Sequence, residues 1–376
     1  MWRSTSATQQ VLRASVVAAT LAFAGCTGLV ADRIVEAPNQ RGVYADGATT
    51  ALFRQGLNGR HEVLKTPVAD IALVHVPRHS FEIRFVTRQV GETTPEGMRQ
   101  ADFFWTYEPL PSEAPRADSQ GTVVVLHGYA MGKEVMGSFA ALLADAGFDV
   151  VLVDLPGHGE SSGEFVTWGI REAEAINALR EALEARSASR PLIGFGISLG
   201  GSVALRAAAT EPGWDAVVAL QPFEDPAAVI PNFRAMAPAW LRFLVSGRRL
   251  EKAVAVAAQR AEFRFDDARL APLLGGYTVP TLIEHGRGDS LVSVSESERI
   301  AAAAPGIIDL MVDEDADHFL LPLMLWRRCP NVLGWLGDQF DLARPEAACD
   351  RSVYDDPENL WHRYRQTGGQ ATDNSS

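Results

Sequence analysis

The chain has 376 residues, of which 47% are hydrophobic and 22% are charged. This is the composition of a globular protein with enough apolar material for a core, and the length fits one large α/β domain or two smaller ones. The formal net charge of −13 argues against general nucleic-acid binding, so we expect no nucleic-acid partner.

The N-terminal residues have the pattern of an export signal. Arg3 and Arg13 precede the uncharged, mostly apolar run ASVVAATLAFAG, and no acidic residue lies before it. A basic region followed by a short apolar run and small residues is typical of a secretory signal. The run is too short for an ordinary membrane span. We therefore expect the mature protein to be exported.

A cysteine follows this run directly. The segment FAGC at 23–26 resembles the bacterial lipobox, which implies that residues 1–25 are a lipoprotein signal peptide and that Cys26 is lipidated. Thr27 in the next position resembles the sorting signal for the outer membrane, so the expected location is the periplasmic face of that membrane. The alternative is ordinary signal cleavage near Ala24 or Gly25.

Export has a consequence for the other two cysteines, Cys329 and Cys349. In an oxidising compartment an even pair is a disulfide candidate. Its loop of about 20 residues would contribute roughly 3 kcal/mol of stability if the bond is unstrained. The alternative is two unpaired thiols.

The segment before the core lacks helices in its sequence pattern. We interpret residues 26–65 as a tether and approach segment. The β-rich runs ADIALVHV and SFEIRFVT, and then ADFFWTYEPL, predict N-terminal antiparallel strands.

From residue 121 the pattern changes to short buried strands that alternate with helices. The strand runs are TVVVLHG, FDVVLVDLPGHG, RPLIGFGIS, WDAVVALQP, VPTLIEHG and GIIDLMVDE. Apolar runs of this kind, separated by helical patterns, predict an α/β fold with a mostly parallel sheet and helices on both faces. In such sheets ligands bind beyond the carboxyl ends of the strands.

The interval between the fourth and fifth of these strands is too long for a structureless loop, so we predict a helical cap at about 223–276. The expected domain spans 66–342. Residues 343–376 form a polar C-terminal extension whose end we expect to be disordered.

A serine nucleophile is predicted at the end of the third strand. The segment GFGISLGG has the spacing G-x-S-x-G around Ser198, which is typical of a sharp strand-to-helix turn that exposes a nucleophile. A serine hydroxyl needs a base, and the base needs an orienting group. Asp289 follows the fifth strand and His318 follows the sixth, so each lies at the expected edge of the sheet.

Five segments together carry a family resemblance. LHGYAMGKE, VDLPGHGESSGE, GISLGGSVA, GRGDSLV and DADHF resemble, in order and spacing, the landmarks of α/β-hydrolases, over about 121–335. The esterase, monoacylglycerol-lipase and serine aminopeptidase-like branches are all similar. The resemblance implies that Ser198 is the nucleophile, His318 the base and Asp289 the acid. It also implies that the backbone N–H groups of Tyr129 and Leu199 form the oxyanion hole, with no metal and no cofactor.

Other polar residues have alternative interpretations. Glu224 or Asp225, after the fourth strand, is the main rival for the acid, because some hydrolases place it there. Asp315 and Asp317 are near His318 only along the chain. We interpret the remaining candidate histidines as structural, in turns beside the site or on early strands: His127, His158, His75 and His79.

The predicted cap is both apolar and basic. Over 231–270 it has eight basic and four acidic residues. This excess favours either contact with an anionic membrane or substrate, or a solvated helix face. An apolar cluster favours either a site for an acyl chain or an anchor between cap and domain: Phe233, Met236, Trp240, Leu241, Phe243, Leu244 and Val245.

These observations predict a membrane-anchored serine hydrolase that cleaves a carboxylic ester, such as a lipid or acyl ester, through an acyl-enzyme. The same triad also serves peptidases, amidases, thioesterases and acyltransferases. A non-catalytic binding protein on a hydrolase scaffold is the remaining alternative.

Overall fold

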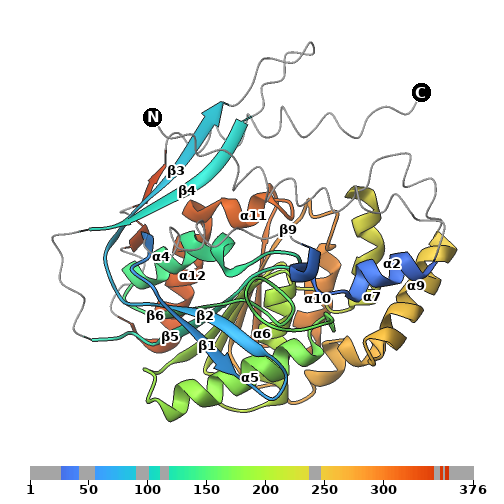
Figure 1. Ribbon diagram of the computed structural model, residues 1–376. Coiled ribbons are helices and arrows are strands. Elements are labelled where there is room, and N and C mark those ends of the chain that lie inside the picture. Colours follow the sequence, from blue (N-terminus) through green and yellow to red (C-terminus); the bar gives the residue numbers. More distant parts are fainter. Residues whose placement is uncertain are drawn as a thin grey trace.

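The structure is a computed structural model that describes residues 27–41, 56–89, 101–110, 118–236, 247–342, 348–349 and 352–354 (Figure 1). The predicted signal peptide, Cys26 and most of the C-terminal extension lie outside these residues. Within them, no helix is long and apolar enough to span a bilayer.

The centre of the molecule is an eight-stranded sheet with the order β1-β2-β6-β5-β7-β8-β9-β10. The strands, in chain order, are β1 (Arg60–Lys65), β2 (Asp70–Val76), β5 (Thr122–Leu126), β6 (Asp149–Val153), β7 (Leu192–Ile197), β8 (Ala216–Leu220), β9 (Thr281–Gly286) and β10 (Ile308–Asp313). β2 pairs antiparallel with β1 and β6, and the other pairings are parallel. The predicted parallel core of six strands is confirmed.

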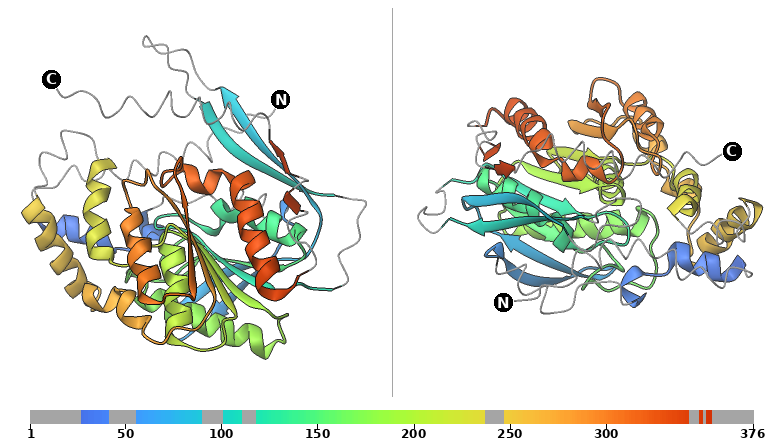
Figure 2. Two further views of the ribbon diagram at one scale, coloured as in Figure 1. Left: turned by 180° about the vertical axis from the view of Figure 1, so that it is seen from behind. Right: turned by 90° about the horizontal axis from the view of Figure 1, so that it is seen from above.

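Helices cover both faces of this sheet (Figure 2). Val124 and Leu126 of β5 belong to one apolar core, whereas Val123 and Val125 belong to the other, because successive side chains of a strand point to opposite faces. The first core includes α5 (Ile170–Ala185), α6 (Leu199–Thr210) and α10 (Val294–Ala303). The second includes the 3-10 helix η3 (Lys133–Met136), α4 (Gly137–Asp145), α11 (Leu320–Leu323) and α12 (Leu325–Phe340).

A second sheet has the order β11-β3-β4, and its strands are β3 (Phe81–Gln89), β4 (Ala101–Pro109) and β11 (Ser352–Tyr354). β3 and β4 form an antiparallel ribbon that extends away from the central sheet (Figure 1). The predicted N-terminal antiparallel strands are therefore present. They divide between the two sheets, because β2 pairs with β6 while Phe81 and Ile83 of β3 enter the core beside α4.

Within residues 26–65, which we interpret as a tether and approach segment, the structure describes residues 27–41 and 56–65. Helix α2 (Thr27–Val35) buries Val30, Ala31 and Ile34, and is followed by the 3-10 helix η2 (Pro38–Arg41) and later by β1. Helix α2 has only nine residues, too few for its apolar periodicity to stand out in the sequence. The segment packs on the domain because this face finds a partner in the cap.

The predicted cap between β8 and β9 is helical over its described residues. It contains α7 (Pro226–Val229), η4 (Ile230–Met236), α9 (Gly247–Arg260), η5 (Phe265–Ala268) and η6 (Ala271–Leu273). α9 lies beside α2 in both views (Figures 1 and 2). The N-terminal helix and the cap therefore form one layer over the domain.

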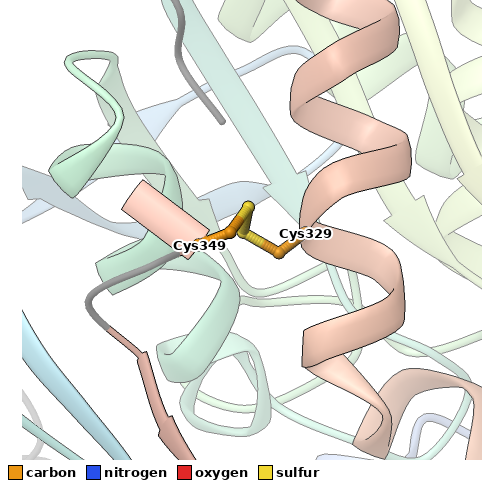
Figure 3. The surroundings of a disulfide bond; sticks show 2 residues. All are labelled: Cys329 and Cys349. Carbon is orange, nitrogen blue, oxygen red and sulfur yellow. A yellow bond between two sulfur atoms is a disulfide. The ribbon is translucent and has the colours of Figure 1, made fainter. Parts of the chain in front are cut away.

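The structure joins Cys329 of α12 to Cys349 through a disulfide, with an S–S distance of 1.98 Å and 5.6 Å between the Cα atoms (Figure 3). The bond holds the chain that leaves α12 against that helix. β11 follows Cys349 closely and pairs with β3, so the C-terminal residues that the structure describes are tied to both α12 and the second sheet.

Candidate active site

Ser198 occupies a strained turn between β7 and α6. Its backbone has φ 52° and ψ −115°, a conformation that few non-glycine residues adopt. The flanking glycines make the turn possible. A Cβ on Gly196 would lie 2.2 Å from the carbonyl carbon of Gly200, and one on Gly200 would lie 2.4 Å from the Leu126 carbonyl oxygen. The turn raises the serine at the carboxyl end of the sheet, as the G-x-S-x-G spacing predicts.

His318 and Asp289 meet at the same edge. Asp289 lies in the loop after β9, and His318 lies after β10. The Nδ1 atom of His318 is 2.7 Å from Oδ2 of Asp289. Because β7, β8, β9 and β10 are neighbours and parallel, the loops at their carboxyl ends come together although they are far apart in the chain.

The Asp289 carboxylate is held by several donors. Its Oδ1 accepts hydrogen bonds from the backbone N–H groups of Leu291 (2.9 Å) and Val292 (2.7 Å). Burial raises the pKa of this carboxyl, but the contacts with His285, His318 and Val292 outweigh that effect and lower the pKa to about 2. Asp289 is therefore ionised throughout the neutral range and can stabilise a protonated His318.

Two further side chains, which were not predicted from the sequence, contact this carboxylate. Gln221, directly after β8, donates from Nε2 to Asp289 Oδ2 (2.8 Å) and to the Asp317 carbonyl (3.0 Å). His285 places Nε2 3.4 Å from the same Oδ2. A polar residue at the carboxyl end of the fourth parallel strand was the available signal for Gln221.

No hydrogen bond connects Ser198 Oγ with His318 in the part of the chain that the structure describes. In proteins without bound substrate, contacts of this kind are often long and tighten only in the complex. His318 and Asp289 are thus paired, and Ser198 lies at the same edge of the sheet.

The loop after β5 lies against the serine turn. A Cβ placed on Gly128 would be 3.7 Å from the Ser198 Cβ. Tyr129 follows Gly128, and Leu199 is the first residue of α6, where backbone N–H groups have no partner within the helix. Gly128 therefore lies against Ser198 in space, and Leu199 follows Ser198 directly in the chain.

His127 connects this loop to the one after β6. It is fully buried, its Nε2 accepts from the Leu155 N–H (3.0 Å), and its Nδ1 lies 2.8 Å from the Gly128 carbonyl. Burial lowers the pKa of His127 to about 4, so the ring is neutral. These contacts give it a structural role, and His158, with Nδ1 3.0 Å from the Pro156 carbonyl, is buried in the same region.

A buried ion pair also braces this loop. Lys133 Nζ lies 2.5 Å from Asp154 Oδ2, and the Lys133 N–H donates to Oδ1 of the same carboxylate (2.7 Å). Burial alone would lower the pKa of Lys133, but the Asp154 and Glu134 carboxylates raise it above its usual range. Lys133 is therefore charged, and Asp154 ties the loop after β5 to the end of β6.

The cap reaches both sides of the site through adjacent residues. Asn232 donates from Nδ2 to the Leu291 carbonyl in the Asp289 loop (2.8 Å). Phe233 packs edge-on against Tyr129, with ring centroids 5.9 Å apart. Phe233 of the apolar cap cluster thus lies beside the site. The other members of the cluster lie outside the described part: the Met236 side chain and residues Trp240, Leu241, Phe243, Leu244 and Val245.

The other candidates have partners elsewhere. Glu224 pairs with Arg269 (3.0 Å), and Asp225 accepts from the Ala227 N–H at the start of α7. Asp317 accepts from the Phe319 N–H at the start of α11. Of the remaining candidate residues, Asp315 pairs with Arg327 (3.6 Å), His75 lies 3.0 Å from Glu62, and His79 lies 2.8 Å from the Ser80 carbonyl. Asp289 alone of the proposed acids is hydrogen-bonded to His318.

Part of the basic excess of the cap is neutralised locally. Arg269 pairs with Glu224, Arg264 with Asp266, and Arg260 with Asp32 of α2. Arg248 and Lys252 are exposed on α9. Across the described ranges, no group of three or more His, Cys, Asp or Glu residues is arranged to hold a metal ion.

Comparisons with known proteins find similarity in sequence and in fold. Residues 117–269 match the family described as Serine aminopeptidase, S33. The chain is similar in structure to AbyA5, with a TM-score of 0.55 at 16% identity, over 91% of this chain and 87% of that chain. In fold, this chain is an α/β-hydrolase.

Curated sequence relatives match parts of the chain. The chain is 25% identical to YqkD of Bacillus subtilis over 207 residues, which are 54% of this chain and 66% of that protein. It is 29% identical over 233 residues to the pimeloyl-[acyl-carrier protein] methyl ester esterase of Methylococcus capsulatus, covering 52% of this chain and 87% of that enzyme. The chain spans 31% of the length of a second such esterase, from Stenotrophomonas maltophilia, and 51% of the length of human Protein ABHD12B.

Proposed function

We propose that this α/β-hydrolase is a serine hydrolase that cleaves a carboxylic ester through an acyl-enzyme. The observation that carries the proposal is the His318–Asp289 hydrogen bond at the same sheet edge as Ser198, which stands on a strained turn. A nucleophile, a base and an ionised acid with these relations constitute the machinery of acyl transfer.

In the first half-reaction Ser198 Oγ attacks the ester carbonyl while His318 Nε2 takes the hydroxyl proton. Asp289 remains ionised, accepts the His318 Nδ1–H and stabilises the imidazolium. The N–H groups of Leu199 and Tyr129 receive the oxyanion. His318 then gives the proton to the leaving alkoxide, so an alcohol departs and the acyl group stays on Ser198. Water, activated by His318, releases the acid and restores the serine.

Ester chemistry is supported by the pimeloyl-[acyl-carrier protein] methyl ester esterase among the relatives. Phe233 beside Tyr129 adds an apolar surface from the cap, which suits an acyl or lipid ester. The family description, Serine aminopeptidase, supports a second candidate, a peptidase or amidase with the same triad. Thioesters and acyl transfer to another acceptor would use the same steps.

Labelling by a fluorophosphonate, followed by hydrolysis of p-nitrophenyl esters of graded chain length and of the matching anilides, tests this proposal. We expect labelling and ester turnover in the wild type. Ser198→Ala should lose both, with a fall of about 10⁶-fold in kcat. Ser187→Ala, at an exposed serine after α5, is the control and should behave as the wild type. Faster anilide than ester turnover would favour the amidase, and an unlabelled, folded wild type would favour a binding protein.

We also propose that the enzyme is exported as a lipoprotein, with lipid on Cys26, and acts at the periplasmic face of the outer membrane. The basic and apolar N-terminus supports this location, and so does a disulfide between Cys329 and Cys349. Incorporation of labelled palmitate into the wild type but not into Cys26→Ser is the expected result. Equal recovery of the wild type and Cys26→Ser in the soluble fraction would contradict the proposed lipid anchor.

A further inference from the structure

We propose that the N-terminal segment, residues 27–39, positions the oxyanion-hole loop through the buried face of α2 and through its backbone contacts. The inference rests on the proposed function, because it concerns the Tyr129 N–H as an oxyanion donor. It adds a part that lies well before the family match, which begins at residue 117.

The C-terminal turn of α2 accepts hydrogen bonds from two aromatic side chains, Tyr129 in the loop after β5 and Trp168 just before α5. The Tyr129 hydroxyl donates to the Arg33 carbonyl (3.2 Å), and the Trp168 indole N–H donates to the Ile34 carbonyl (3.2 Å). The last carbonyls of a helix have no partner within it, so they are ready acceptors. Two residues of the hydrolase domain therefore bind adjacent carbonyls of one helix end.

These two rings also pack on each other. Tyr129 and Trp168 are stacked, with centroids 4.9 Å apart and planes inclined by 19°. Phe233 of the cap and His158 contact the Tyr129 ring edge-on, each at 5.9 Å. The Tyr129 side chain is thus fixed by neighbours around its ring and by a hydrogen bond at its tip. Its own backbone N–H is one bond from the Cα that carries this ring, so fixing the ring restricts where the N–H points.

The chain after α2 follows the loop that carries the G-H-G-E-S segment. The Val166 N–H donates to the Val35 carbonyl (2.7 Å), and the Ala37 N–H donates to the Glu164 carbonyl (3.0 Å). Asn39 donates from its backbone to Gly157 (3.1 Å) and from Nδ2 to Ser161 (2.7 Å). The segment therefore contacts the second loop of the site along its length.

The other end of α2 is fixed on the cap. Arg260 of α9 donates to the Gly28 carbonyl (2.7 Å) and pairs with the Asp32 carboxylate. Val30 and Ala31 are buried in the same core as Leu250 and Ala253 of α9. Helix α2 thus joins the cap to the Tyr129 loop, and its release would free the Tyr129 hydroxyl and the Trp168 indole together.

A matched pair of substitutions on α2 tests the inference in the full chain. Val30 is 5% exposed and faces the core, whereas its neighbour Leu29 is 47% exposed. Val30→Asp should release α2, and Leu29→Asp should not. Losing an oxyanion donor costs about 10²–10³-fold in rate, so a displaced donor should cost about tenfold in kcat with little change in KM. Leu29→Asp should keep the wild-type kcat.

Two further measurements separate a role of α2 in positioning the Tyr129 N–H from a role in stabilising the fold. A trifluoromethyl ketone forms an oxyanion on Ser198, so its affinity should fall with kcat in Val30→Asp. Tyr129→Phe, which loses only the hydroxyl, should lower kcat about threefold when made alone. Added to Val30→Asp, it should cause no further loss, because both changes remove the contact between Tyr129 and α2.

The outcomes are distinct. If Val30→Asp is digested by protease in α2 yet keeps the kcat and ketone affinity of Leu29→Asp, the inference is overturned. If Val30→Asp does not fold, Tyr129→Phe decides, and unchanged kcat and ketone affinity there overturn it. A wild type that no fluorophosphonate labels overturns the proposed function itself. Labelled wild type with unaffected variants overturns only the role of α2.

Discussion

The two halves of the candidate site are held by different means. On one side, Asp289 accepts hydrogen bonds from His318, Gln221 and backbone N–H groups, and the proposed reacting groups are side chains. On the other side, the proposed donors are backbone N–H groups, and the loop that carries them is held by stacked rings and by the buried Lys133–Asp154 pair.

This difference predicts how each half responds to substitution. Changing a side chain in the acid–base half removes a reacting group or its direct partner, so activity should fall while the fold survives. Changing a side chain in the oxyanion half removes no donor group and alters only the contacts that hold the donors in position. Stability should then fall more than chemistry does.

The largest effect is expected from Asp289→Asn, which removes the charge that stabilises the His318 imidazolium. We expect kcat to fall about 10⁴-fold with a near-normal melting temperature. Asp315→Asn is the control, since Asp315 is closer to His318 in the chain but pairs with Arg327. Steady-state kinetics on both variants measure the effect. Comparable losses in the two variants would remove Asp289 from its assigned role.

In the oxyanion half, Lys133→Met should cost about 3–5 kcal/mol in the free energy of unfolding, because it leaves the buried Asp154 carboxylate without its cation. Lys252→Met, at an exposed position of α9, should be nearly neutral. Denaturant unfolding of both proteins gives the comparison. A Lys133→Met variant as stable as the control would show that the loop is braced by other contacts.

Acid should affect the acid–base half through Asp289. Its pKa in the folded protein, about 2, is below its ordinary value of 3.8. Ionised Asp289 therefore stabilises the folded protein fully above its unfolded pKa. This contribution, about 2 kcal/mol of the free energy of unfolding, is lost as the pH falls toward 2. Between pH 5 and pH 2 the unfolding free energy of the wild type should fall more steeply than that of Asp289→Asn. Parallel curves would contradict the assignment.

The smallest effect is expected at Gln221, which touches no reacting atom but donates to Asp289 and to the Asp317 carbonyl. Gln221→Leu should lower kcat about tenfold, the cost of one or two buried hydrogen bonds. KM should be unchanged, because the positioning of the acid acts on the transition state. Gln259→Leu, at an exposed residue of α9, is the control. A change in KM alone would assign Gln221 to substrate binding.

The sequence by itself determined the parallel core, the Ser198 turn and the order of Ser198, Asp289 and His318. These features are local: apolar runs mark buried strands, glycines mark a tight turn, and topology brings strand ends to one edge. The sequence pattern also predicted a helical cap, because an interval as long as 223–276 within a compact domain needs structure of its own.

Only the tertiary structure decided which residues support these groups. Tyr129 meets Arg33, and Trp168 meets Ile34, across separations of 96 and 134 residues. The same holds for the division of the early strands between two sheets and for the packing of α2 on the cap. A hydrogen bond to a carbonyl or a stacked ring leaves no local pattern, because its partner is chosen by the packing of distant segments rather than by neighbours in the chain.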